Sequence, residues 1–260
     1  RASMLYAWCR HCDDVIDGQA LGFAAEEADE RSAAARLAEL RRRTRAVYAG
    51  EEPTDPVFGA FARVVAEAGI PEAEALDLLA GFEMDVAGHR YETLADTLQY
   101  SYHVAGVVGV MMARVMGAHE PATLDRACDL GIAFQLTNMA RDVIDDARMG
   151  RCYLPRQWLA EAGVPAEELL ERRHRPALAG LAGRLVDQAE PYYRSALAGL
   201  PALPLRSAWA IAAARTVYRD IGRKVQRRGA AAWDSRTGTG PGRKATVLVT
   251  SLGRALDRKS

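Results

Sequence analysis

The stretch that most limits the fold of this protein is residues 138–147, where acidic side chains recur at helical spacing. Asn138, Asp142, Asp145 and Asp146 stand at positions i, i+4, i+7 and i+8, which an α-helix places on one face. Because like charges at this spacing destabilise an isolated helix, we expect a ligand that neutralises them. Hard divalent cations are suited to this, since they prefer oxygen ligands.

A second acidic cluster lies near the start of the chain. Asp13 and Asp17 are four residues apart, and Tyr6 and Arg10 share their helical face. Two such faces opposed across a cavity would hold Mg²⁺ between them, and Mg²⁺ is commonly bound by one or two carboxylates together with substrate phosphates. The two clusters together predict a helical site for a diphosphate. The alternative is that both acidic faces are simply solvated.

The rest of the chain is typical of one all-α domain. Its 260 residues are 49% apolar, which is enough for a sizeable core at the upper end of single-domain length. No segment shows the sustained apolar–polar alternation between hairpin turns that strands would give. Pro191 lies inside one helical pattern and predicts a kink or a break there. The expected helices cover residues 1–18, 24–49, 57–68, 72–89, 94–116, 121–148, 176–200 and 203–228, and a final segment from Lys244.

Charge and hydropathy argue against several kinds of function. Lysine plus arginine and aspartate plus glutamate each number 34, so the formal net charge is +0, and nothing global favours nucleic acid or an anionic surface. There is no signal peptide and no apolar run of about 18 residues, so we expect a cytoplasmic protein. Because the sequence opens within a helical pattern at Arg1, we also expect the N-terminal part of this domain, residues 1–260, to be missing.

At these motifs the chain resembles the squalene/phytoene synthase family. Residues 6–17 are similar to the family's first aspartate-rich motif, and residues 102–109 are similar to a third signature. Residues 135–146, which lead into Gly-Arg-x-Tyr-Leu-Pro at 150–155, are similar to the second motif. The second motif with this tail is highly specific, and the resemblance spans nearly the whole chain. Within the family the chain is most similar to the bacterial phytoene synthases.

The resemblance implies an isoprenoid-synthase helical bundle around a central apolar cavity, and a Mg²⁺-dependent prenyltransferase of carotenoid biosynthesis. Two geranylgeranyl diphosphates would condense head to head through prephytoene diphosphate to 15-cis-phytoene, releasing two diphosphates. Mg²⁺ and cationic side chains would stabilise the departing charge, and apolar walls would keep water from the carbocation. We expect Mg²⁺ or Mn²⁺ as the cofactor and no NADPH. Because substrate and product are apolar, we also expect peripheral membrane contact and a downstream desaturase as a partner.

The resemblance also carries roles onto matching positions of this sequence. The metal ligands of the two acidic motifs match Asp13, Asp17, Asn138, Asp142 and Asp146. The catalytic candidates are Tyr6, Asp13, His103, Asp142 and Tyr218. The substrate-binding candidates are Arg10, Arg90, Tyr91, Gln135, Arg141 and Arg236.

Some of these positions have a second interpretation. The resemblance leads us to expect a tyrosine directly before Val-Ala-Gly, where this protein has His103. Tyr102 precedes it, but adjacent helical residues point about 100° apart, so Tyr102 does not simply substitute. In one interpretation, His103 supplies the polar or proton-transfer group of the reaction, and diphosphate is another candidate base. In the other, it is a core histidine whose hydrogen bonds are satisfied. Arg90 and Tyr91 likewise have either a diphosphate-binding or a structural role.

Two functional alternatives stay open. Within the family, the protein would be a dehydrosqualene or squalene synthase acting on farnesyl diphosphate. Squalene synthesis needs a nicotinamide reductant, and no glycine fingerprint for one appears in the sequence. Outside the family, the protein would be a non-catalytic helical metal-binding or assembly protein. A di-iron bundle would need paired Glu-x-x-His motifs, whereas the sequence has one such motif, from Glu171 to His174.

Overall fold

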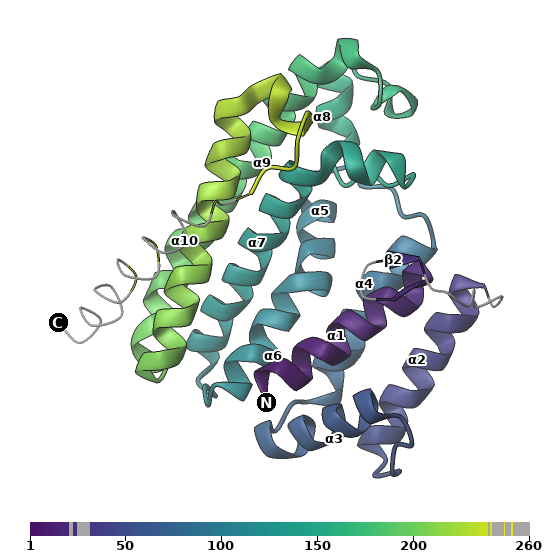
Figure 1. The fold of residues 1–260 in the computed structure, drawn as a ribbon, viewed down its shortest axis with the longest axis vertical. Coiled ribbons are helices and arrows are strands. Elements are labelled where there is room, and N and C mark those ends of the chain that lie inside the picture. The colour runs from purple at the N-terminus through teal and green to yellow at the C-terminus, as the bar shows by residue number, and fades with distance from the viewer. Residues whose placement is uncertain (21–22, 25–31, 239, 241–246, 248–250, 252–260) are drawn as a thin grey trace.

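Helices form nearly all of the regular structure in residues 1–20, 23–24, 32–238, 240, 247 and 251, which are the parts of the protein that this computed structural model describes (Figure 1). The expected all-α class is therefore confirmed. The α-helices are α1 (Ala2–Asp17), α2 (Ala33–Tyr48), α3 (Pro56–Ala68), α4 (Glu72–Val86), α5 (Leu94–Ser101), α6 (Val107–Val115), α7 (Pro121–Arg148), α8 (Arg156–Glu161), α9 (Arg175–Ser195) and α10 (Leu205–Arg228).

Shorter elements join these helices. A π-helical turn, η1 (Tyr102–Gly106), connects α5 to α6. The strands β1 (Gln19–Ala20) and β2 (Phe23–Ala24) pair antiparallel, with Gln19 opposite Ala24. The 3₁₀ turns are η2 (Ala166–Glu168), η3 (Arg172–His174), η4 (Ala196–Ala202) and η5 (Gly229–Trp233).

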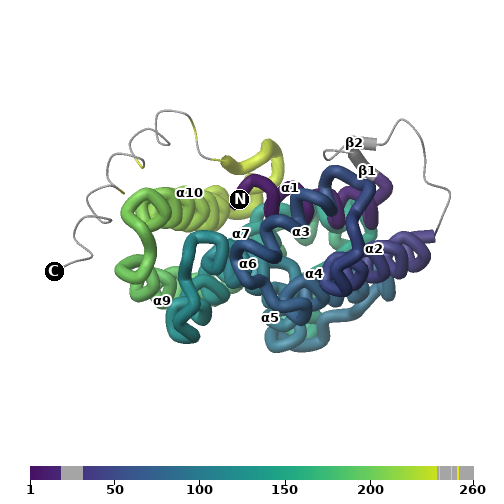
Figure 2. Tube along the Cα trace, turned by 90° about the horizontal axis from the view of Figure 1, so that it is seen from below, coloured from purple at the N-terminus to yellow at the C-terminus, as the bar shows by residue number. Residues whose placement is uncertain are grey.

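Helix α7 is the central element of the bundle. It contacts α5, α6, α9 and α10, and in Figure 1 it runs between the α9–α10 pair and α5. Figure 2 shows the α9–α10 pair on one side of α7 and the group α1 to α4 on the other. The acidic motif that α7 carries therefore lies in the interior of the arrangement and not on an outer helix.

Two main apolar clusters stabilise the bundle. One surrounds α7 and α9 and includes the fully buried Leu136 and Leu178. The other joins α1 to α4, where Trp8 stacks on Phe61 with 3.9 Å between ring centroids. Burying a large apolar side chain contributes about 1.5–3 kcal/mol, so each cluster holds its helices together. The helix formed by α5, η1 and α6 supplies residues to both clusters.

Several helix ends follow directly from local sequence. The carboxylate of Asp55 accepts hydrogen bonds from the backbone amides of Val57 (2.7 Å) and Phe58 (3.3 Å) and so caps α3. Pro56 and Pro121 occupy the first turns of α3 and α7, where their fixed φ suits a helix start. Gly18 ends α1 in the left-handed conformation, with φ of 63°, which glycine adopts without steric cost.

Glycines allow α7 to lie almost in backbone contact with the helix α5–η1–α6. A Cβ atom added at Gly131 would lie 2.1 Å from the carbonyl oxygen of Ala105. A Cβ atom added at Gly109 would lie 2.3 Å from the carbonyl oxygen of Ala127. Because real Cβ atoms do not approach backbone atoms so closely, any larger residue would push the two helices apart. These glycines therefore fix the distance between the two helices.

The structure differs from the sequence-based expectations at three places. The helix expected over 94–116 is interrupted by the π-helical turn at 102–106. Helix α9 continues through Pro191 instead of breaking there. Ala24, expected to begin a helix, lies in β2, and α2 begins at Ala33. Most of the final segment expected from Lys244 lies outside the described residues.

Candidate active site

An apolar cavity of about 330 Å³ lies between α6, α7, η4 and α10. Most of the side chains that line it are apolar, so most of its wall offers no hydrogen-bonding groups. The expected central apolar cavity is therefore present. Its wall includes Val108, Met112, Leu130, Phe134, Leu200 and Ile211.

Four of the predicted site residues line this cavity. Gln135 and Asn138 extend from α7, Tyr6 from α1 and Tyr218 from α10. The ring of Tyr218 stacks on Phe134 with 4.2 Å between centroids, whereas Tyr6 is 63% exposed. Asn138 is the first residue of the second acidic motif, so this motif begins at the cavity wall, and Asp142 follows one turn further along α7.

The acidic motif of α7 separates into two sets of side chains. Arg141 donates a hydrogen bond from Nε to Oδ1 of Asp142 (2.7 Å), and both side chains are largely buried. Asp146 is also partly buried. Asp145, however, is 62% exposed at its side chain and pairs with Arg148 at 2.7 Å. The prediction that all of these carboxylates share one ligand face is therefore wrong for Asp145, whose carboxylate faces solvent and is already paired with Arg148.

The acidic motif of α1 is held by arginines. Arg10 bridges Asp13 (2.7 Å) and Asp14 (2.8 Å) from the preceding turn. The carboxylate of Asp17 pairs with Arg151, which lies just beyond the end of α7, and the contact from Nη1 to Oδ2 measures 3.4 Å. Arg151 therefore ties the first acidic motif to the segment that follows the second.

Both acidic motifs lie within electrostatic reach of Arg151. Burial, and then the charge of Asp142, raise the pKa of Asp146 to about 7, while Arg151 acts to lower it. Burial, and then the charge of Asp17, raise the pKa of Asp13 to about 6, and Arg151 again acts to lower it. The side chain of Asp13 is 40% exposed, so solvent screens part of this effect and the shift at Asp146 is the stronger one.

The chemistry of these residues fits a divalent cation bound by oxygen atoms. Oδ1 of Asn138 is buried without a hydrogen-bond partner, while Nδ2 of the same side chain is 3.4 Å from Gln135. A buried acceptor without a donor costs free energy unless a ligand or water satisfies it. Within the described ranges, no three His, Cys, Asp or Glu side chains stand close enough to hold a metal ion. Cation binding would therefore require the arginines to release their carboxylates.

The raised pKa of Asp146 predicts a specific pH dependence of stability. Because its folded-state pKa of about 7 lies above the ordinary value of 3.8, the folded protein binds more protons between these values, and this group lowers stability as pH rises. In metal-free protein we expect Asp146→Asn to gain stability relative to wild type between about pH 5 and about pH 8. Urea unfolding at the two pH values measures this difference. The exposed Asp145→Asn is the control, and a difference between Asp146→Asn and wild type that does not change with pH would contradict the prediction.

His103 lies away from the cavity. Its Nδ1 is 3.0 Å from the carbonyl oxygen of Asp77 in α4, and the neighbouring Tyr102 donates its hydroxyl hydrogen bond to the Asp77 carboxylate at 2.7 Å. His103 is not among the described residues that line the cavity. Of the two interpretations, this position favours a satisfied core histidine over proton transfer, because the π-helical turn directs residues 102 and 103 towards α4.

The other substrate-binding candidates occupy different surroundings. Arg90 is exposed and lines a small pocket of about 210 Å³ together with Arg151. Tyr91 is 3% exposed, and its ring packs edge-on against Tyr100 at 5.5 Å between centroids, which favours its structural interpretation. Arg236 is exposed in the loop after η5, and it is not one of the described residues that line the cavity.

A polar cluster that was not predicted from the sequence lies beside the acidic motifs. Asp85 of α4 accepts hydrogen bonds from the hydroxyls of Tyr100 (2.7 Å) and Tyr153 (3.0 Å). Burial raises the pKa of Asp85 above its usual value, and the hydrogen bond from Tyr100 opposes this most. Tyr153 belongs to the Gly-Arg-x-Tyr-Leu-Pro tail, so its membership in a motif was visible in the sequence. No pattern of neighbouring residues, however, indicated that this tail contacts α4.

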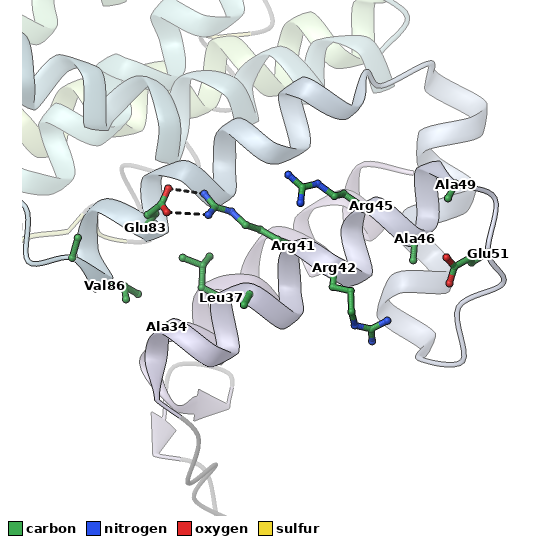
Figure 3. Close-up of a pocket in the computed structure, with 12 residues that line it drawn as sticks. Ala34, Leu37, Arg41, Arg42, Arg45, Ala46, Ala49, Glu51, Glu83 and Val86 are labelled. Atoms are coloured by element: carbon green, nitrogen blue, oxygen red, sulfur yellow. Dashed lines mark hydrogen bonds and ion pairs between the residues drawn. The ribbon is translucent and has the colours of Figure 1, made fainter.

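Another hollow, larger than the apolar cavity, lies elsewhere on the described surface. It measures about 810 Å³ and is lined by residues of α2 and α4, among them Arg41, Arg45 and Glu83. Figure 3 shows Arg41 bound to Glu83 through two hydrogen bonds, of 3.0 and 2.7 Å. None of the predicted site residues lines this hollow. It is an open surface groove, whereas four of the predicted site residues line the smaller apolar cavity.

Comparison with known sequences identifies the relatives of this protein. The sequence pattern of the squalene/phytoene synthase family matches residues 1–245. A phytoene synthase from Pseudescherichia vulneris is 57% identical over 257 residues, which cover 99% of this protein and 83% of the relative. A 15-cis-phytoene synthase from Enterobacter agglomerans is 57% identical over 253 residues, which cover 97% of this protein and 85% of the relative.

Comparison with solved structures also finds proteins of similar fold. A dehydrosqualene synthase crystallised with a ligand superposes with a TM-score of 0.85 at 30% sequence identity, covering 98% of this protein and 86% of that one. The isoprenoid-synthase bundle expected from the resemblance is thus confirmed, and so is the resemblance itself. With the family pattern matched over residues 1–245 and relatives more than half identical, this protein belongs to the squalene/phytoene synthase family.

Proposed function

We propose that this protein is a 15-cis-phytoene synthase, an isoprenoid prenyltransferase that joins two molecules of geranylgeranyl diphosphate head to head in carotenoid biosynthesis. One observation carries the proposal: Asn138 of the second acidic motif lines an apolar cavity, and Arg151, just beyond that motif, pairs with Asp17 of the first. A lipid tail fits the apolar part, and a metal-bound diphosphate fits the charged part. Relatives that are 57% identical carry the same activity in their names.

The residues of the site divide the work of this reaction. Asp13, Asp17, Asn138, Asp142 and Asp146 would hold Mg²⁺ or Mn²⁺. When bound, the metal ion would neutralise charge on the leaving diphosphate and so promote ionisation of the carbon–oxygen bond. The guanidinium groups of the site, such as those of Arg10 and Arg141, would bind the leaving group, since arginine suits phosphate recognition.

The cavity wall protects the cationic intermediate. Apolar side chains keep water away from a carbocation, and the ring face of an aromatic residue attracts a cation. Tyr218 and Phe134, which stack on each other and line the cavity, are the aromatic residues best placed for this. Tyr6 lies at the exposed edge, where it would contact the diphosphate end of the substrate.

The product assay tests this proposal directly. Purified protein is incubated with Mg²⁺ and either geranylgeranyl or farnesyl diphosphate, with and without NADPH. We expect a forty-carbon hydrocarbon from geranylgeranyl diphosphate, in equal yield with and without the reductant, because the reaction ends in proton loss and not in reduction. Omitting the metal should abolish the product. Formation of a thirty-carbon product alone would reject the proposal and assign the protein to dehydrosqualene or squalene synthesis.

We also propose that the protein contacts membranes peripherally and passes its product to a desaturase. None of the helices in the described residues is both long enough and apolar enough to cross a bilayer. The apolar lining of the cavity supports a lipid substrate, and a lipid of this kind partitions into a bilayer because burial of its apolar surface is favourable.

A further inference from the structure

Arg151 lies at a position that the backbone defines closely. It follows Gly150, which has a φ of 74° and reverses the backbone at the end of α7. The backbone amide of Arg151 donates a hydrogen bond to the carbonyl oxygen of Asp146 at 2.9 Å. The residue is therefore tied at its backbone to the last turn of the second acidic motif.

The next residues fasten this segment to two other helices. The hydroxyl of Tyr153 donates to Asp85 of α4 at 3.0 Å, and the carbonyl oxygen of Tyr153 accepts from the hydroxyl of Thr97 of α5 at 2.9 Å. Its ring stacks on Tyr100 with 4.7 Å between centroids, and Tyr153 is 8% exposed. Because these contacts are buried, Arg151 extends from a fixed segment and not from a loose loop.

From this fixed base, the guanidinium group spans the gap between the acidic motifs. It binds both carboxylate oxygens of Asp17 at the end of α1, and the side chains of Arg151 and Asp17 are 29% and 13% exposed. It also acts electrostatically on Asp13, Asp85 and Asp146. Arg151 is thus the cation that stands among the carboxylates of three helices.

A metal ion and Arg151 cannot both have full use of Asp17. Metal coordination needs the carboxylate oxygens that the guanidinium group occupies, and two cations at one carboxylate repel each other. The arginine has a second suitable partner, however, because a diphosphate offers the same paired oxygens for bidentate binding. The pairing of Arg151 with Asp17 is therefore one of two arrangements that Arg151 would adopt, and binding to a diphosphate is the other.

We propose that Arg151 is a switching counter-ion: it holds Asp17 in the metal-free protein, gives Asp17 up to the metal ion, and then binds the diphosphate that arrives with the metal. This role rests on the proposed function, because it takes Asp17 as a metal ligand. It makes metal and diphosphate binding mutually reinforcing, since each favours the arrangement that the other needs. The segment anchored by Tyr153 and Asp85 positions the switch.

Metal binding without substrate tests the proposal. Affinity for Mn²⁺ alone is measured by electron paramagnetic resonance, and affinity for preformed Mn²⁺–pyrophosphate by calorimetry. For Arg151→Gln we expect Mn²⁺ alone to bind about tenfold tighter, because its competitor is gone, and Mn²⁺–pyrophosphate to bind about tenfold weaker, because a charge-assisted contact is lost. A merely structural arginine would not change the two affinities in opposite directions.

Two further variants sharpen the experiment. Arg148→Gln removes an arginine from an aspartate of the second acidic motif, but its pair with Asp145 is exposed, so both affinities should stay at wild-type values. Arg151→Lys keeps the charge but loses the bidentate geometry. The two affinities should therefore change in the same directions as in Arg151→Gln, but by smaller factors. Circular dichroism checks that each variant folds. If Arg151→Gln does not fold, the directions in which the two affinities change in Arg151→Lys decide whether the switching role holds.

The outcomes separate this inference from the proposed function. If wild type binds Mn²⁺ and Arg151→Gln binds it no tighter, or binds both ligands more weakly, the switching role is rejected while the metal site stands. If wild type binds neither Mn²⁺ nor Mn²⁺–pyrophosphate, the proposed metal site fails, and the switching role fails with it.

Discussion

Asp142→Asn is expected to lower turnover of geranylgeranyl diphosphate by about a hundredfold to a thousandfold, the usual cost of removing one group that stabilises charge in the transition state. Asp142 lies one turn beyond Asn138 on the central helix, and its side chain is 22% exposed. Asparagine keeps the shape of the side chain but removes the charge that would bind a cation. The measurement is steady-state product formation with Mg²⁺ in excess, with helix content followed by circular dichroism.

Asp145→Asn provides a matched control, because it makes the same change three residues further along the same helix. Asp145 is 62% exposed and pairs with Arg148, so its loss should leave turnover near that of wild type. Both variants should keep the helix content of wild type. Wild-type turnover in Asp142→Asn would refute its role as a ligand, and equal losses in the two variants would show a general effect of charge on α7.

Gly131→Ala is expected to have the largest effect on stability, a loss of about 3 kcal/mol or more, at the upper end of what overpacking costs. The added Cβ would lie 2.1 Å from the carbonyl oxygen and 2.6 Å from the carbonyl carbon of Ala105, and 2.8 Å from Cα of Gly106. All three are backbone atoms, so no rotation about a side-chain bond relieves the clash. Helix α7 would have to separate from η1, and the free energy of unfolding measured in urea reports the cost.

Gly180→Ala tests whether the contact, and not the loss of a glycine, causes this effect. Gly180 lies within α9, and a Cβ added there meets nothing within 4 Å. Alanine should stabilise the helix at that position by up to about 1 kcal/mol, because glycine is the poorer helix former. If the two variants unfold at the same urea concentration, the close approach of α7 to η1 does not limit stability.

Helix boundaries that depend on local chemistry were predictable. Asp55 and Pro56 begin α3, and α7 runs from Pro121 to Arg148, as the pattern predicted. A cap, a proline or an apolar stripe acts within one or two turns of helix, so neighbouring residues are enough to place it. The π-helical turn at residues 102–106 was not predictable in this way, because it depends on how the helix fits between α4 and α7.

The orientation of individual site residues was less predictable than the site itself. Asn138, Asp142 and Asp146 share the expected face of α7, yet Asp145 is exposed although its spacing placed it with them. His103 is directed towards Asp77, away from the cavity that its neighbours Val104 and Ala105 line. In both cases helical spacing gives the direction of a side chain around its own helix. It does not show which neighbouring element, or solvent, that side chain faces.

By itself the sequence determined the helical class, the family and the identity of the acidic rows, because periodicity and motif spacing are properties of consecutive residues. Only the tertiary structure decided which carboxylates face inward and that Arg151 pairs with Asp17 and acts electrostatically on Asp146. Asp17 and Arg151 are more than a hundred residues apart in the sequence, and they come together only when the helices pack. Contacts between such distant residues depend on how the helices pack, and spacing along the sequence does not encode that packing.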